Sequence, residues 1–100
     1  MNRKLILTPE SRADIADAIV FLRERSPQLP SRFRERLEYV YSMILEYPEI
    51  YPVVYRNFRR GLLRRFPYSV FYVVVDEETI LITGVIPNAR DASVWKRRAR

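Results

Sequence analysis

Residues 59–75 read RRGLLRRFPYSVFYVVV, an arginine-rich half followed by an almost wholly apolar half. Residues Val70 to Val75 are all β-branched or aromatic, with Pro67 before them and three acidic residues after them. A bounded apolar run of this kind is typical of a central strand covered on both faces. The arginine-rich half is too charged for such a position, so we expect it to form a preceding strand with one face in water. Together the halves predict a hairpin that places arginine side chains beside the central strand of the core.

The composition limits the kinds of function that the chain can perform. Its 100 residues suit one domain with one hydrophobic core. It contains neither cysteine nor histidine, which excludes disulfides, cysteine-ligated metal sites and the commonest acid/base group near neutral pH. With only two glycines there is also no Gly-rich phosphate loop. We therefore expect no metal site and no cofactor.

Charge and hydropathy indicate the kind of partner. The formal net charge of +6 predicts an anionic partner, such as nucleic acid, an acidic protein segment or a membrane surface. The alternative is that the charge only keeps a small domain soluble. No apolar run approaches the roughly 20 residues that cross a bilayer, and the residues before Thr8 are too few for a signal peptide. We therefore expect a cytoplasmic protein.

The first half of the chain predicts a strand followed by two helices. A short strand is expected at residues 4–8, and Thr8-Pro9-Glu10 then supplies a capping hydroxyl, a first-position proline and a first-turn carboxylate. The first helix should therefore begin at the proline and end near Arg25. The second helix begins at Pro27 or at Pro30, which the sequence leaves open. The short, stiff loop between them predicts an antiparallel helix hairpin.

The second half predicts three strands, at about Phe58 to Phe66, Ser69 to Val75 and Thr79 to Ile86. Two short connections in a row make them an antiparallel meander. Residues 91–100 should form a short C-terminal helix around Trp95. We therefore predict a two-layer α+β fold of the order strand, helix, helix and three strands, in which the N-terminal strand joins the meander and the helix hairpin covers one face of the sheet.

The arginines are the first candidates for a binding site. Because four of them lie close together on the predicted hairpin, they could converge with one beyond the last strand and bind phosphates or carboxylates at one end of the sheet. The alternative is a solvated sheet edge, where charged side chains discourage edge pairing. The five residues are Arg59, Arg60, Arg64, Arg65 and Arg90.

Other polar residues are weaker candidates for a functional site. Tyr68 lies beside the arginines, which could acidify its phenol and make it an acid or a base; otherwise it packs like any buried tyrosine. Asp14 and Asp17 lie three apart in the first helix with arginines near them, so we expect ion pairs on the helix surface. Gly84, within the last strand, predicts a bulge or a close packing contact.

Several motifs, in order along nearly the whole chain, resemble the RelE/ParE toxin superfamily of bacterial toxin-antitoxin modules. The resemblance implies a single RelE/ParE-like toxin domain over residues 1–100, held inactive by an antitoxin whose C-terminal segment wraps the toxin. The motifs are Thr8-Pro9-Glu10-Ser11-Arg12-Ala13-Asp14-Ile15, Arg32-Phe33, Arg64-Arg65-Phe66-Pro67-Tyr68 followed by Val70-Phe71-Tyr72, and Ala89-Arg90-Asp91 followed by Trp95.

Two branches of that superfamily differ in target: ParE-like toxins, often called plasmid stabilisation proteins, poison DNA gyrase, whereas RelE-like toxins cut messenger RNA in the ribosome. RNA cleavage needs an acid and a base. The resemblance places such groups at a histidine just before Arg90-Asp91 and at an aromatic residue after Trp95, and this chain has no histidine and no tyrosine there. The resemblance therefore implies a ParE-like gyrase inhibitor that is not an enzyme. The alternatives are a ribosome-dependent endoribonuclease and an inactive toxin homologue.

The resemblance also implies partners and site residues. The expected partner is a small antitoxin with an acidic C-terminal segment, which forms a hetero-oligomer with the toxin. A ribonuclease would use Arg64, Arg65, Tyr68 and Arg90 for catalysis. The residues expected to contact the target or the antitoxin are Arg59, Arg60, Arg64, Arg65, Tyr68, Arg90 and Trp95.

Overall fold

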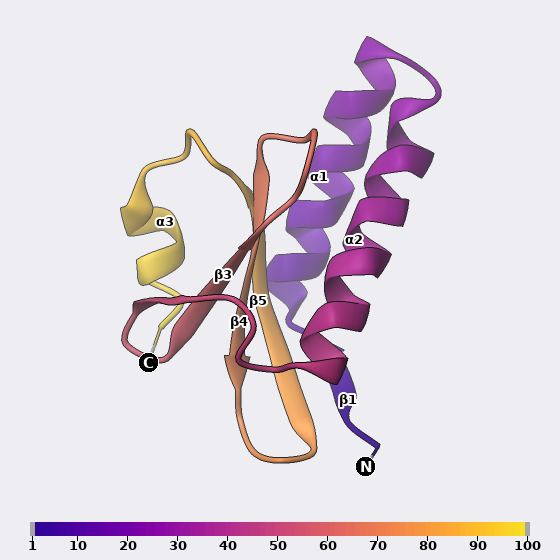
Figure 1. Ribbon diagram of the computed structural model, residues 1–100. Coiled ribbons are helices and arrows are strands. Elements are labelled where there is room, and N and C mark those ends of the chain that lie inside the picture. Colours follow the sequence, from indigo (N-terminus) through magenta and orange to yellow (C-terminus); the bar gives the residue numbers. More distant parts are fainter. Residues whose placement is uncertain (1, 100) are drawn as a thin grey trace.

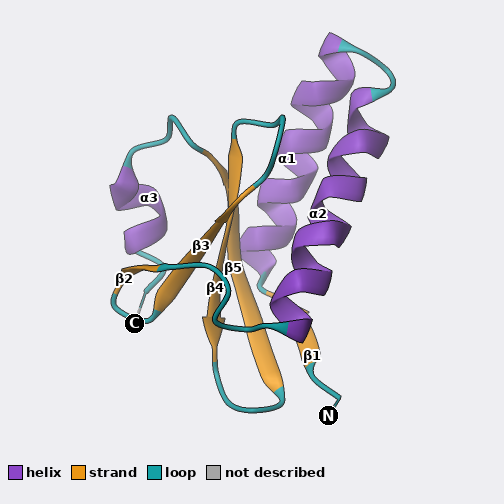
Figure 2. Ribbon diagram, in the orientation of Figure 1, coloured by secondary structure: helices purple, strands orange, loops and turns teal. Residues whose placement is uncertain are grey.

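The computed structural model describes residues 2–99, in which one sheet lies between a helix hairpin and a short C-terminal helix (Figures 1 and 2). The strand order is β1-β5-β4-β3-β2, with β1 parallel to β5 and the other neighbours antiparallel. The elements are β1 (Lys4–Leu7), α1 (Pro9–Arg25), α2 (Leu29–Glu46), β2 (Val53–Tyr55), β3 (Phe58–Leu62), β4 (Tyr68–Val74), β5 (Thr79–Pro87) and α3 (Ala92–Lys96).

Local capping signals explain where α1 begins. The Oγ1 atom of Thr8 accepts a hydrogen bond of 3.1 Å from the backbone N–H of Ser11, and Pro9 occupies the first helical position. The predicted bounds of α1 are confirmed at both ends. Helix α2 begins at Leu29, between the two candidate prolines, so that Pro30 stands in its first turn.

The middle strand of the sheet is β4, as predicted for the apolar run. Its side chains alternate between the two faces, because successive residues of a strand point to opposite sides. Val70 and Tyr72 pack in the large core cluster with α1 and α2, whereas Phe71 packs in a second cluster on the other face. The Tyr72 hydroxyl donates a hydrogen bond of 2.7 Å to the backbone carbonyl of Pro48, which ties the segment after α2 to the sheet.

The predicted α+β fold is confirmed, and α3 adds a short third layer (Figure 2). The ring of Trp95 stacks on Phe71 with centroids 4.6 Å apart and an interplanar angle of 25°. Phe58 and Ile86 complete this second cluster. Burial of a large aromatic ring therefore holds α3 against the face of the sheet that the helix hairpin leaves uncovered.

The strand bounds differ most at β3, which ends at Leu62 rather than at Phe66. Leu63 and Phe66 are both buried in the core cluster, and a spacing of three places them on opposite faces of a continuous strand. The chain therefore leaves the strand and turns, with Arg65 at a φ of 71°. The bounds of β4 and β5 differ from the prediction by one residue.

The sheet also has an edge strand, β2, that we did not predict. It has only three residues and pairs with β3 through a tight turn at Arg56 and Asn57. Prolines at positions 48 and 52 mark the segment before it as a loop, and three residues are too few to show an alternating pattern.

The bulge expected at Gly84 is present. The register of β4 against β5 shifts there, because Phe71 pairs with Gly84 and the next residue, Tyr72, pairs with Ile82. A Cβ atom on Gly84 would lie 3.0 Å from a guanidinium nitrogen of Arg98. The glycine therefore makes room for a side chain from the C-terminal segment.

That side chain forms what we call the Arg98 latch, which joins the segment after α3 to α1. The Nη1 atom of Arg98 lies 2.6 Å from Oδ2 of Asp14, and Nη2 lies 3.1 Å from Oδ1. Nη1 also donates a hydrogen bond to the carbonyl of Thr83, and Asp14 accepts one from the backbone N–H of Val85. The expected helix-surface ion pairs were wrong, because in residues 2–99 the Arg98 latch is the only ion pair.

None of the helices in residues 2–99 has the length and apolar character needed to cross a membrane.

Tyr41 gives a prediction about alkaline pH. Its buried hydroxyl has no hydrogen-bond partner within residues 2–99, and burial, aided by Glu38, raises the pKa of Tyr41 to about 12. Above pH 10 the unfolded chain loses this proton more readily than the folded one, so stability falls as pH rises from 10 to 12. Tyr41→Phe should reduce that fall by about 1–2 kcal/mol and raise stability at pH 7. Urea unfolding of the wild type and the variant at pH 7, 10 and 12 measures both effects. An equal loss of stability at alkaline pH in the wild type and in Tyr41→Phe would contradict this prediction.

Candidate functional site

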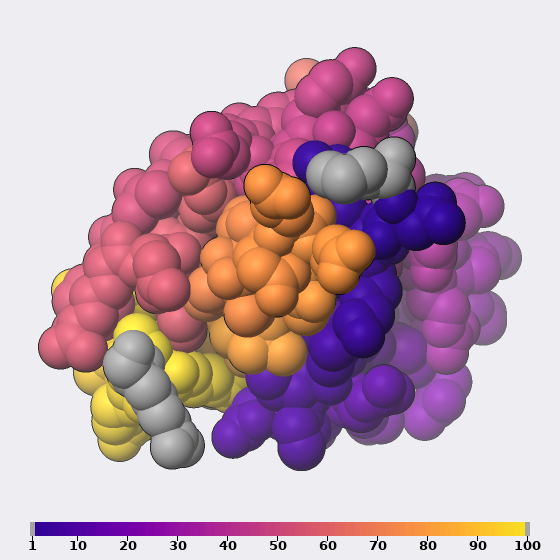
Figure 3. Space-filling view, turned by 90° about the horizontal axis from the view of Figure 1, so that it is seen from below, coloured from indigo at the N-terminus to yellow at the C-terminus, as the bar shows by residue number. Residues whose placement is uncertain are grey.

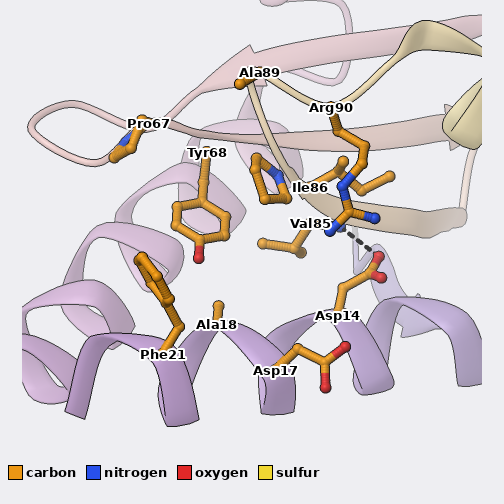
Figure 4. Close-up of a pocket in the computed structure, with 11 residues that line it drawn as sticks. Asp14, Asp17, Ala18, Phe21, Pro67, Tyr68, Val85, Ile86, Ala89 and Arg90 are labelled. Carbon is orange, nitrogen blue, oxygen red and sulfur yellow. Dashed lines mark hydrogen bonds between the residues drawn. The ribbon is translucent and has the colours of Figure 1, made fainter. Parts of the chain in front are cut away.

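A groove of about 430 Å³ lies between α1 and the end of the sheet where β4 begins and β5 ends (Figure 4). We call it the α1 groove. Most of its lining is apolar, with acidic side chains on α1 and one arginine from the turn before α3. The lining residues are Asp14, Asp17, Ala18, Phe21, Pro67, Tyr68, Val85, Ile86, Pro87, Ala89 and Arg90.

The groove exists because a small and a large side chain follow one another on the same face of α1. Ala18 is buried and leaves space above the helix, while Phe21, one turn later, is 46% exposed and forms a wall. Opposite them, Pro67 and Pro87 flank the paired ends of β4 and β5. Prolines cannot extend the strand ladder, so the sheet stops and leaves the groove open.

Tyr68 stands at the centre of the α1 groove. Its ring packs edge-to-face on Phe33, with centroids 5.2 Å apart, and its hydroxyl points toward α1 (Figure 4). Burial raises the pKa of Tyr68 above its usual value, and this outweighs the opposite effects of Arg90 and Arg25. Of the two alternatives for Tyr68, the acidified phenol is therefore wrong, and the packing of a buried tyrosine is what the structure has. At neutral pH Tyr68 is a neutral hydrogen-bonding group and not a base.

Arg90 and the acidic residues set the charge of the groove. Arg90 is exposed, and Figure 4 shows its guanidinium reaching over the groove toward the Asp14 end. The carboxylate of Asp14 is already held by the backbone N–H of Val85 and by the Arg98 latch. Arg90 therefore remains as a cation at the rim of an apolar depression, where it can meet an anionic group of a partner.

The arginines of the hairpin do not converge, contrary to the expectation. On the helix face of the sheet, Arg59 donates a hydrogen bond of 2.8 Å to the carbonyl of Tyr51. On the other face, Nε of Arg60 donates a hydrogen bond of 2.9 Å to Oγ of Ser69. Neighbouring positions of a strand must diverge in this way. Arg64 and Arg65 lie in the turn between β3 and β4 and line a different groove, beside α2.

Trp95, another predicted contact residue, is 9% exposed and packs between Phe71 and Tyr55. In this structure its ring holds α3 in place. It would influence a partner through the position of α3 and not through a free ring face.

Sequence reasoning missed residues that the structure brings to this site. Val20 and Phe21 both lie outside the apolar stripe that buries α1, and the structure leaves each of them 46% exposed. Two neighbouring apolar residues outside the stripe were the available signal of an interaction surface. Arg98 gave no signal, because it is one of several basic residues near the C-terminus and its partner is 84 positions away.

The fold and the sequence together place the chain among the toxins of type II toxin-antitoxin systems. Within that class the chain belongs to the ParE toxin family: the sequence model of that family, described as the ParE toxin of the type II toxin-antitoxin system parDE, matches residues 5–92. A solved structure titled as the chromosomal ParDE TA system from P. aeruginosa is similar in fold, with a TM-score of 0.68 at 19% identity over 85% of this chain and 95% of that chain. No curated protein matches the chain.

Proposed function

We propose that this protein is a ParE-type toxin that inhibits DNA gyrase in the cytoplasm and is neutralised by a cognate antitoxin. The observation that carries the proposal is the match of residues 5–92 to the ParE toxin family. The structure contributes one supporting feature, which is an apolar groove with an exposed aromatic ring, Phe21, and an arginine, Arg90, at its rim.

The chemistry of the α1 groove argues against a ribonuclease. Attack by a 2′-hydroxyl requires a group that accepts its proton near neutral pH. The chain has no histidine, and the raised pKa of Tyr68 keeps its phenol protonated. The carboxylates of Asp14 and Asp17 are then the only bases among the lining residues, and the carboxylate of Asp14 is already held by the Arg98 latch. Moreover, Tyr68 and Arg90 line one groove, while Arg64 and Arg65 line another. The four residues expected for catalysis are therefore divided between two surfaces.

The α1 groove suits a segment of the antitoxin. Its floor can take apolar side chains, and Arg90 at the rim can pair with a carboxylate of an acidic segment. Phe21 offers an exposed aromatic anchor of the kind that dominates interface energies. The resulting complex would be a hetero-oligomer in which the antitoxin covers the groove.

Replacing Phe21 by alanine should weaken binding of the antitoxin about tenfold, because truncation of an aromatic anchor commonly costs more than about 1 kcal/mol. The partner is the small protein encoded by the neighbouring reading frame, and the measurement is isothermal titration calorimetry.

Tyr39→Ala is the matched control. Tyr39 is 50% exposed on α2 and does not line the α1 groove. Both variants should keep nearly wild-type stability, because surface substitutions usually change it by less than about 0.5 kcal/mol. Equal losses of affinity in the two variants would remove the α1 groove from the antitoxin interface.

The target is tested with purified components. The protein should inhibit DNA supercoiling by gyrase, and added antitoxin should restore it. The same preparation should leave messenger RNA on translating ribosomes intact. Ribosome-dependent cleavage without an effect on gyrase would establish the ribonuclease instead.

A further inference from the structure

A second groove, of about 580 Å³, lies between α2 and the turn that joins β3 to β4. We call it the arginine groove. It gathers four guanidinium groups against a single carboxylate, from positions on two separate elements. The lining residues are Leu29, Arg32, Glu35, Arg36, Arg64, Arg65 and Phe66.

Glu35 is the one carboxylate beside these four guanidinium groups, and it is not paired with any of them. Within residues 2–99, none of them forms an ion pair, and the buried Nε atom of Arg36 has no hydrogen-bond partner. Arg32 and Arg36 are four positions apart on α2, a spacing at which like charges repel. A bound anion would relieve the repulsion and could supply acceptors for the unused donors.

The backbone of the turn supports the same conclusion. Arg65 has a φ of 71°, in the left-handed region that residues with a Cβ atom seldom adopt. Such local strain often occurs at binding sites. A glycine would suit this conformation better, yet the position holds an arginine whose side chain lines the groove.

A group of acidic residues at the far end of the molecule would help to orient it on a polyanion. The end of α2 and the turn between β4 and β5 lie at the opposite end of the molecule from the arginine groove (Figure 1), and Figure 3 views that opposite end directly. It carries an open depression whose lining includes four carboxylates and one arginine, Arg3, among apolar side chains. The acidic residues are Glu46, Glu49, Asp76 and Glu77. An anionic surface would attract one end of the protein and repel the other.

We propose that the arginine groove binds the phosphodiester backbone of duplex DNA. Guanidinium groups bind phosphates bidentately, and this groove is mainly polar, whereas the α1 groove has the apolar floor that suits a peptide.

A duplex fits the arginine groove better than a single strand, because proteins that bind single strands present free aromatic faces for the bases. Phe66 is only 8% exposed. Tyr39, one turn after Arg36 on α2, is 50% exposed, but the guanidinium of Arg36 lies over one face of its ring, 5.1 Å from the centroid. DNA binding goes beyond the proposed inhibition of gyrase, and purified toxin alone tests it.

The test is fluorescence anisotropy with a short labelled DNA duplex over a series of salt concentrations. The groove variant is Arg32→Ala with Arg65→Gly, in which the glycine accepts the positive φ and so protects the fold. The slope of log K against log salt should become shallower by about 2, one unit for each lost phosphate contact.

The matched control is Arg34→Ala with Arg56→Gly. It also removes one exposed arginine from α2 and one arginine at positive φ, 53° for Arg56, from a turn, but neither residue lines the groove. The control should change the slope by less than half as much. Equal effects of the two variants would overturn the proposal, because net charge alone would then explain binding.

Two competitors complete the experiment. Single-stranded RNA and polyglutamate should each displace the duplex poorly at equal charge concentration. Tighter binding of RNA or of polyglutamate, or no binding of the duplex at low salt, would each refute a duplex DNA site. These outcomes do not depend on gyrase, so they are separable from a failure of the proposed function.

Discussion

Phe33→Ala is expected to lower the free energy of unfolding by about 3–5 kcal/mol, the cost of removing a fully buried aromatic ring. Phe33 is 0% exposed and packs edge-to-face on both Phe66 and Tyr68, with ring centroids 5.5 and 5.2 Å away. Phe66 lines the arginine groove and Tyr68 lines the α1 groove. The ring of Phe33 therefore packs against one lining residue of each candidate site.

Urea unfolding followed by circular dichroism measures this loss. Since small domains are stable by only about 5–15 kcal/mol, this loss should be a large part of the total and should clearly lower the urea midpoint. Phe21→Ala is the control, because it removes the same ring from an exposed position of the neighbouring helix. A loss for Phe33→Ala no greater than that of the control would show that the packing between α2 and the sheet has been misjudged.

Arg98→Ala should destabilise the fold by about 2–3 kcal/mol. Breaking one partner of a buried ion pair costs about 3–5 kcal/mol, and we reduce this for solvent screening because the two side chains are 20% and 15% exposed. The variant also leaves the carbonyl of Thr83 without its guanidinium donor. The free energy of unfolding from urea titrations measures the effect.

A double-mutant cycle separates the Arg98 latch from general packing. Asp14→Ala alone removes the acceptor of both Arg98 and the Val85 N–H. The double variant should therefore lose clearly less stability than the sum of the single variants, by about 1 kcal/mol or more. Additive losses would mean that the ion pair contributes little and that the apolar packing of the second cluster, with Trp95 at its centre, holds the C-terminal segment.

Features with local causes could be predicted from the sequence. A capping threonine followed by proline marks the start of α1, and the uninterrupted run after Pro67 marks the central strand. Both depend on residues within one turn or one strand, where periodicity and capping act directly. The strand, helix, helix, meander order then limits the topology to few arrangements.

Features that depend on distant partners could not be predicted. Asp14 looks like a surface carboxylate until the Arg98 latch brings the end of the chain to it. The early end of β3 follows from the joint burial of Leu63 and Phe66 under α2. The sequence left open whether the arginines near Tyr68 acidify its phenol, because its burial, which has the largest effect on its pKa, depends on Phe33 and α1.

The most direct test of the account is inducible expression in a bacterial host, with and without the neighbouring antitoxin gene, while labelled thymidine and leucine are incorporated. For a ParE-type toxin that inhibits gyrase, thymidine incorporation should fall first and the antitoxin should prevent the fall. If leucine incorporation falls first, with cleavage of messenger RNA, the gyrase proposal is contradicted and the protein is a ribonuclease.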